Sequence, residues 1–139
     1  MINEQNPDLI LIGGDLIDNS VVPLYAENMM EELSELKAPL GIYMVPGNHE
    51  YISGMNASAR FIQGTPIQLL RDSIVTLPSG IQLIGRDDRS NTARRSLQEL
   101  MANVDKNKPI ILLDHQPYKL TESETAGVDL QFSGHTHRG

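Results

Sequence analysis

The sequence has 139 residues and contains no cysteine and no tryptophan; its aromatic residues are four Tyr and two Phe. Without cysteine it has no disulfide, no thiolate zinc site and no cysteine nucleophile. No apolar run approaches the ~18 residues that a membrane-spanning helix needs. The first eight residues, MINEQNPD, also lack the apolar core of a signal peptide. These absences exclude several classes of site, but they indicate no cellular compartment.

Positive charge is also scarce, with 11 Lys and Arg against 18 Asp and Glu and a net charge of −7. This balance argues against a nucleic-acid backbone or an anionic membrane as a partner. It would also repel a phosphate group unless a local cation offsets it. The length suits one hydrophobic core, and no repeat or linker divides the chain, so we expect residues 1–139 to form a single domain.

Strand and helix patterns alternate along most of the chain. Buried strands are predicted at residues 8–14, 40–47, 109–115 and 128–134, where short apolar runs end in glycine or polar residues. Helical spacing of apolar residues predicts helices at 24–37, 57–63 and 93–104. Between them, residues 67–72, 73–78 and 81–87 indicate further strands, with a hairpin turn at Pro78-Ser79-Gly80. The expected fold class is α/β, layered, with a β-rich middle.

Polar side chains of metal-binding type follow the ends of these predicted strands. They are Asp15 and Asp18, then Asn48, His49 and Glu50, then Asp114 and His115, and finally His135 and His137. Ligands of open α/β sheets gather beyond the carboxyl ends of strands, and all four histidines of the sequence lie in such places.

Each of these residues also has an ordinary structural explanation. A Gly-Asp pair after a strand is often a turn or a helix cap, and an Asn or His after Gly can satisfy loop backbone groups. A lone histidine such as His115 is more often a hydrogen-bonded core or surface residue. The order of the groups, each at a strand end, nevertheless favours a metal site over four unrelated loops.

Four blocks of the sequence carry a family resemblance. They are Gly14–Asp18 (GDLID), Gly47–Glu50 (GNHE), the lone His115, and Gly134–His137 (GHTH). In this order they resemble the calcineurin-like metallophosphoesterase superfamily, in which a two-metal site lies between two β-sheets flanked by helices. The family's opening Asp-x-His block has no counterpart here. We therefore expect a metallophosphoesterase-like β-sandwich that lacks edge strands at both ends, with any signal or anchor outside this sequence. A small protein complete as it stands is the alternative.

The resemblance implies a set of metal ligands. One ion would take Asp15, Asn48, His115 and His135, and a second would share Asp15 and add His137. The other ligands of the second ion belong to the absent block, so at most one ion should bind well, because sites that hold a metal typically supply about three protein ligands. These oxygen and imidazole donors suit Mn, Fe, Zn or Ni without distinguishing among them.

The reaction implied by the resemblance is two-metal hydrolysis of a phosphoric monoester or diester, impaired in this fragment. His49 would be the general acid that protonates the leaving alkoxide. Glu50 and Asp18 would either keep His49 protonated or orient a ligand histidine. Arg138 is a further candidate contact for a phosphate oxygen.

One more polar cluster, Gly85–Arg89 (GRDDR), also follows a predicted strand. It either lines the substrate pocket or forms a solvated turn with local ion pairs, and the solvated turn is the favoured interpretation.

Two non-enzymatic functions remain open on the sequence alone. The same fold could serve as a protein-interaction scaffold with a vestigial site, or as a simple metal-binding protein. Loss of the opening strand would also leave an unpaired apolar sheet edge, which favours a homodimer through that edge.

Overall fold

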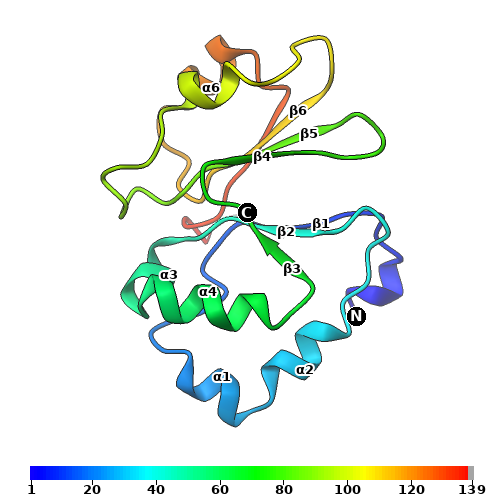
Figure 1. Cartoon of the computed structure of the whole chain (residues 1–139), viewed down its shortest axis with the longest axis vertical. Coiled ribbons are helices and arrows are strands. Elements are labelled where there is room, and N and C mark those ends of the chain that lie inside the picture. Colours follow the sequence, from blue (N-terminus) through cyan, green and yellow to red (C-terminus); the bar gives the residue numbers. More distant parts are fainter. Residues whose placement is uncertain (138–139) are drawn as a thin grey trace.

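Within residues 1–137, the part of the chain that the computed structural model describes, seven short strands form two stacked sheets (Figure 1). The first sheet has the order β1-β2-β3, with bounds Ile10–Ile12, Ile42–Met44 and Ile67–Leu69. All three strands are parallel. Their carboxyl ends therefore lie along one edge of the sheet.

The second sheet has the order β4-β5-β6-β7, with bounds Ser73–Thr76, Gln82–Gly85, Ile110–Leu113 and Leu130–Phe132. β4 and β5 are antiparallel, whereas β5, β6 and β7 run parallel to one another. The predicted hairpin turn is confirmed, because the N–H of Leu77 donates to the carbonyl of Ile81 at 2.8 Å and the N–H of Gly80 donates back to the carbonyl of Leu77 at 2.8 Å.

Helices cover the outer face of each sheet (Figure 1). The described helices are a 3-10 turn at Asn3–Gln5, α1 Val22–Ala26, α2 Met29–Ser34, α3 Asn48–Ile52, α4 Met55–Gln63, α5 Leu97–Met101 and α6 Leu120–Ala126. Residues of α1, α2 and α4 pack against the first sheet, and residues of α5 and α6 pack against the second. The molecule thus has four layers, helix–sheet–sheet–helix, as expected for the predicted fold class.

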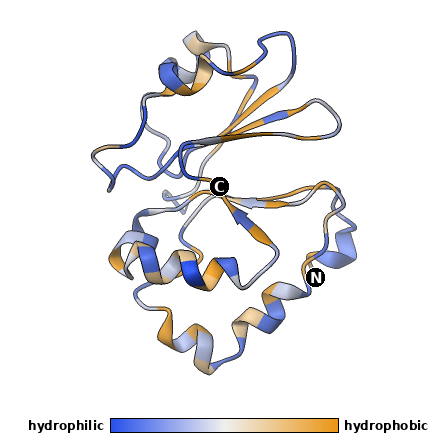
Figure 2. Ribbon diagram, viewed as in Figure 1, coloured by the Kyte–Doolittle hydropathy of each residue, from blue (hydrophilic) through white to orange (hydrophobic). Residues whose placement is uncertain are grey.

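Side-chain alternation along the strands builds a core on both faces of the first sheet. In β2, Ile42 and Met44 belong to the cluster under the helices, whereas Tyr43 and the following Val45 belong to the cluster between the sheets. Leu83 of β5 fills the same inter-sheet cluster from the opposite side. Burial of each such side chain contributes about 1.5–3 kcal/mol. Hydrophobic residues, drawn in orange, recur along the strands of both sheets (Figure 2).

Two predicted helices differ from the structure. Residues 24–37 form two helices, because Asn28 adopts a left-handed conformation (φ 55°) that ends α1 before α2 begins. The predicted helix at 93–104 is shorter, because Ser96 caps α5: its hydroxyl accepts from the N–H of Glu99. Helix α3 lies where a loop was expected. Within residues 1–137 no helix has the length and hydrophobicity that crossing a membrane requires.

Candidate metal centre

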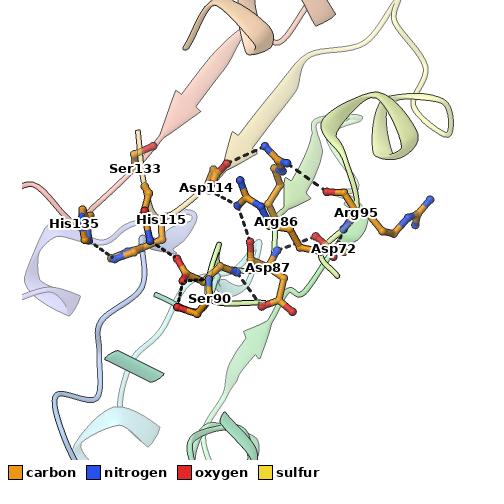
Figure 3. A network of polar contacts seen from close by, with 12 residues as sticks. Asp72, Arg86, Asp87, Ser90, Arg95, Asp114, His115, Ser133 and His135 are labelled. Carbon is orange, nitrogen blue, oxygen red and sulfur yellow. Dashed lines mark hydrogen bonds and ion pairs between the residues drawn. The ribbon is translucent and has the colours of Figure 1, made fainter. Parts of the chain in front are cut away.

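Four side chains from four separate segments meet at the carboxyl ends of the strands. Asp15 follows β1 and Asn48 begins α3 after β2, so both come from the first sheet. His115 follows β6 and His135 follows β7, so both come from the second sheet. The site therefore lies where the same edges of the two sheets adjoin, and Figure 3 shows the two imidazoles side by side.

The donor atoms of these residues converge on one small space. The Nε2 atom of His115 lies 3.1 Å from Asp15 Oδ2, 3.1 Å from Asn48 Oδ1 and 3.3 Å from His135 Nδ1. Asn48 Oδ1 is 3.0 Å from His135 Nδ1. Ligand atoms about 2.1 Å from one metal ion stand roughly 3.0–3.4 Å from each other. The observed separations thus fit a single divalent ion.

Hydrogen bonding prepares His115 for this role. Its Nδ1 lies 2.6 Å from the carbonyl oxygen of Gly13, which can only accept, so Nδ1 carries the proton. In the neutral imidazole, Nε2 then carries the lone pair that a metal ion would take, and this atom faces the oxygen atoms of Asp15 and Asn48. An imidazole oriented by a backbone carbonyl is the usual arrangement of a metal-ligating histidine. His115 is only 1% exposed, which makes this orientation rigid.

Two glycines allow the loops to approach one another beneath the donors. A side chain at Gly14, whose φ is +92°, would place its Cβ 2.6 Å from His115 Nδ1. A Cβ at Gly47 would lie 2.8 Å from the ring of the same histidine. Both separations are far below a van der Waals contact. Glycine is therefore required in both motifs by close packing, and at Gly14 also by the backbone conformation.

Glu50 holds the first-sheet half of the site together. Its fully buried carboxylate accepts hydrogen bonds from the backbone N–H groups of Asp15 (2.9 Å), Ile17 (2.9 Å) and Gly47 (2.7 Å). The bond to Gly47 also satisfies the first orphan N–H of α3. All three contacts go to backbone N–H groups, two in the loop after β1 and one at Gly47. The role expected for Glu50 at His49 or at a ligand histidine stays a prediction.

His49 lies beside the candidate ligands and is paired with Asp18. Its Nδ1 is 2.8 Å from Asp18 Oδ1 and 3.1 Å from the Asp18 carbonyl oxygen. The carbonyl of Asp18, together with the charges of Asp15 and Asp18, raises the pKa of His49 above its ordinary 6.5. The backbone N–H of His49 donates to Asp15 Oδ1 at 3.0 Å, which leaves Oδ2 of that carboxylate for the donor cluster.

His137 does not join the group. It is exposed, with a left-handed backbone (φ 52°), and the described cluster of acidic and imidazole ligands consists of Asp15, His115 and His135. The sequence offers it only Asp15 as a partner, so its role as a ligand stays a prediction. Arg138 lies outside the described residues.

The GRDDR segment is a buried network, so the favoured interpretation as a solvated turn is wrong. Asp87 and Asp88 are 3% and 0% exposed. Burial alone would raise the pKa of Asp87, but hydrogen bonds from Tyr51, Arg71 and Asn91 hold it below its usual value. Burial raises the pKa of Asp114 above its usual value, and Arg94 and Arg86 only partly offset this effect.

This network reaches Asp114, directly before His115 (Figure 3). It also reaches Gln116, directly after His115. Sequence reasoning missed it because charged residues in a turn are mostly solvated. The available signal was the run of four charged residues, Arg86–Arg89, directly after the apolar strand β5.

Comparison with known proteins gives a consistent result. The family model for calcineurin-like phosphoesterases matches residues 1–139. The chain is 35% identical to an uncharacterized metallophosphoesterase of Helicobacter pylori, over 99% of this chain and 38% of that protein. It is 35% identical to another from Aquifex aeolicus, over 97% of this chain and 52% of that protein.

A Danio rerio transmembrane protein with a metallophosphoesterase domain is 30% identical over the whole chain, which covers 35% of that protein. Among solved structures, a 5'-nucleotidase precursor of Thermus thermophilus matches 91% of this chain and 32% of its own length, with 18% identity and a TM-score of 0.63. This likeness shows the fold. The chain thus spans about 38% of the Helicobacter relative and about half of the Aquifex one.

Proposed function

Because this chain belongs to the calcineurin-like phosphoesterase family, we propose that it forms the catalytic core of a metal-dependent phosphoric ester hydrolase acting on monoesters or diesters. The family implies divalent metal use and phosphate-ester substrates. The single observation that carries the proposal is the convergence of one carboxylate, one amide oxygen and two imidazoles from two sheets at separations near 3 Å.

In this proposal Asp15, Asn48, His115 and His135 hold one divalent ion. A second ion would take Asp15 and His137, together with ligands that this sequence lacks. Such ions supply Lewis-acid stabilisation of the charge on the phosphate oxygens. They also offset the net charge of −7, which would otherwise repel an anionic substrate.

His49 is the proposed general acid. It directly follows the ligand Asn48 and keeps its Nε2 free of the contacts with Asp18, which all involve Nδ1. The raised pKa increases its protonated fraction near neutral pH, which is the form that donates a proton to a leaving alkoxide. Asp18 orients the ring, since it contacts Nδ1 through both its side chain and its carbonyl.

Two alternatives, an interaction scaffold and a simple metal-binding protein, make different predictions. A scaffold needs neither the donor convergence nor an imidazole beside it whose pKa is raised by an aspartate. A simple metal-binding protein binds one ion and hydrolyses nothing under any condition. The pairing of His49 with Asp18 favours the hydrolase, because metal binding alone does not require it.

Hydrolysis of p-nitrophenyl phosphate and bis(p-nitrophenyl) phosphate in the presence of Mn²⁺ tests the proposal. We expect this chain to be nearly inactive and a longer natural chain with an upstream Asp-x-His block to be active. Comparison of the two substrates assigns the monoester or diester preference. An inactive longer chain that carries the complete block and binds Mn²⁺ would overturn the hydrolase proposal.

His49→Ala in the active longer chain separates catalysis from metal binding. We expect turnover to fall by about 100-fold or more, in line with the usual contribution of a general acid, while Mn²⁺ content is unchanged. Ile52→Ala is the matched control, because Ile52 lies on the same helix α3 with 60% of its surface exposed. Loss of bound metal in His49→Ala would show that His49 is a ligand and not the acid.

A further inference from the structure

The candidate metal centre is split between the two sheets, so its geometry depends on how they are held relative to each other. Asp15 and Asn48 are attached to the first sheet, and His115 and His135 to the second. We infer that residues 86–94, the loop after β5, are a positioning element that holds these two pairs in register, with Asp87 as its central residue. The inference rests on the proposed metal site but does not require hydrolysis.

The 86–94 loop forms hydrogen bonds with the residues directly before and directly after His115. Arg86 and Arg94 each donate to the Asp114 carboxylate, at 3.1 and 3.2 Å, and Asp114 directly precedes His115. The side-chain amide of Gln116, directly after His115, donates to Asp88 Oδ2 at 3.0 Å. The carboxylates involved are almost fully buried, which gives these bonds little freedom.

The same loop binds the helix that carries Asn48. The hydroxyl of Tyr51, on α3, donates to Asp87 Oδ1 at 2.7 Å. Arg71, in the connection between the two sheets, donates to Asp87 Oδ2 through Nε and Nη2 at 3.1 and 2.9 Å. Its Nη2 also donates to the Tyr51 oxygen at 3.0 Å. Asp87 therefore links α3 and the inter-sheet connection to the loop that binds the neighbours of His115.

The loop itself is held in one conformation. Asp87 Oδ1 also accepts from the N–H of Asp88 at 2.9 Å, and Asn91 donates to Oδ2 at 3.0 Å. Asp72 accepts from the N–H groups of Asp87 and Arg95, at 2.9 and 2.8 Å (Figure 3). Burial raises the pKa of Tyr51 to about 12, so this phenol is protonated at neutral pH and can donate its hydrogen bond to Asp87.

A network that only adds stability would behave differently from a positioning element. Its loss would lower the free energy of unfolding without shifting Asn48 against His115. Loss of a positioning contact loosens both partners together and weakens the metal site, as removal of groups that orient metal ligands does in other proteins.

Tyr51→Phe is the sharpest variant, because it removes one hydroxyl and leaves the ring in place. Ser123→Ala is its matched control: it also removes one hydroxyl that donates to a side chain, Gln131 at 2.7 Å, but both residues belong to the second-sheet half. Amide hydrogen exchange of the metal-free chain is measured for each. We expect Tyr51→Phe to speed exchange at least threefold in both residues 48–52 and residues 114–116, and Ser123→Ala in neither.

Faster exchange confined to α3, or equal effects of the two variants, would overturn the inference. A Mn²⁺ titration gives the second readout. We expect Tyr51→Phe to raise the Kd about 10-fold, the lower end of the range for groups that orient ligands, and Ser123→Ala to leave it unchanged. An unchanged Kd in folded Tyr51→Phe also overturns the inference. A parent chain that binds no Mn²⁺ counts against the proposed metal site, and hydrogen exchange then decides the positioning role alone.

Discussion

Replacement of Glu50 by glutamine tests the claim that one buried carboxylate organises the first-sheet half of the site. The Glu50→Gln side chain keeps the shape of the native one but offers one acceptor oxygen in place of two. With that oxygen at the Oε2 position, the bonds from Asp15 and Gly47 persist. The amide NH₂ then faces the N–H of Ile17, which loses its acceptor at a fully buried position.

The expected loss follows from these contacts. A hydrogen bond to a charged group is worth about 1.5–3 kcal/mol, and a buried N–H without an acceptor costs about 1–3 kcal/mol. We expect E50Q to lower the free energy of unfolding by about 2–4 kcal/mol, out of the ~5–15 kcal/mol usual for a domain. With a urea m-value of about 2 kcal/mol/M, the middle of the usual range, the unfolding midpoint falls by roughly 1–2 M. Glu50→Ala removes all three acceptor contacts and should leave the chain largely unfolded.

Urea unfolding followed by circular dichroism measures this shift, and Glu99→Gln is the control. Glu99 occupies the same third position of its helix and reaches back to the N–H of Ser96 at 2.7 Å, but it is exposed. E99Q should therefore shift the midpoint much less than E50Q. Equal shifts in the two variants would refute the role assigned to Glu50.

Three further predictions concern other parts of the molecule. Gly14→Ala combines a left-handed backbone with a clash on His115, so we expect about 2–4 kcal/mol of destabilisation by urea unfolding. Gly54→Ala, with a similar φ of +95° and nothing within 4 Å, isolates the backbone part, and an equal loss there would exclude the clash. The pKa of Asp87 is lowered from its ordinary 3.8, so its carboxylate stabilises the native state at a pH above 3.8, and this stability is lost as the pH falls below that value. Asp87→Asn should therefore flatten the pH dependence of the unfolding free energy between about pH 5 and 2, and an unchanged slope contradicts this. Leu130 is 56% exposed on edge strand β7, so we expect concentration-dependent self-association in sedimentation velocity that Leu130→Lys reduces; a monomer at all concentrations would contradict it.

The sequence predicted the fold class and the groups that surround the site, because both depend on local patterns. The run ILI of β1 and the run IILL of β6 are short, apolar and bounded by polar residues, so their strand character and their polar ends were visible. The interruptions of the helices were not visible in the sequence. Asn28 interrupts a regular helical pattern only because its backbone turns left-handed, which the spacing of Met29 and Leu33 does not reveal.

At the site, residue types and order predicted which side chains would gather, but not what each one contacts. The grouping of Asp15, Asn48, His115 and His135 was implied by the family resemblance, and the position of each residue after a predicted strand agreed with it. The part played by Glu50 could not be predicted, because its partners are backbone N–H groups up to 35 residues away. Backbone donors look the same in every sequence, so only the folded chain identifies them.

The division of the donor set between two sheets has a consequence for how the protein folds. Asn48 meets His115 across 67 residues and His135 across 87, and Gly13 meets His115 across 102. Contacts of such long range form late, because closing a large loop costs conformational entropy before the contact can stabilise the chain. Either half folded alone would contain only two of the four donors. Tight Mn²⁺ binding would then be a signal of the completed chain, and the rate at which that affinity appears during refolding would time the docking of the two sheets.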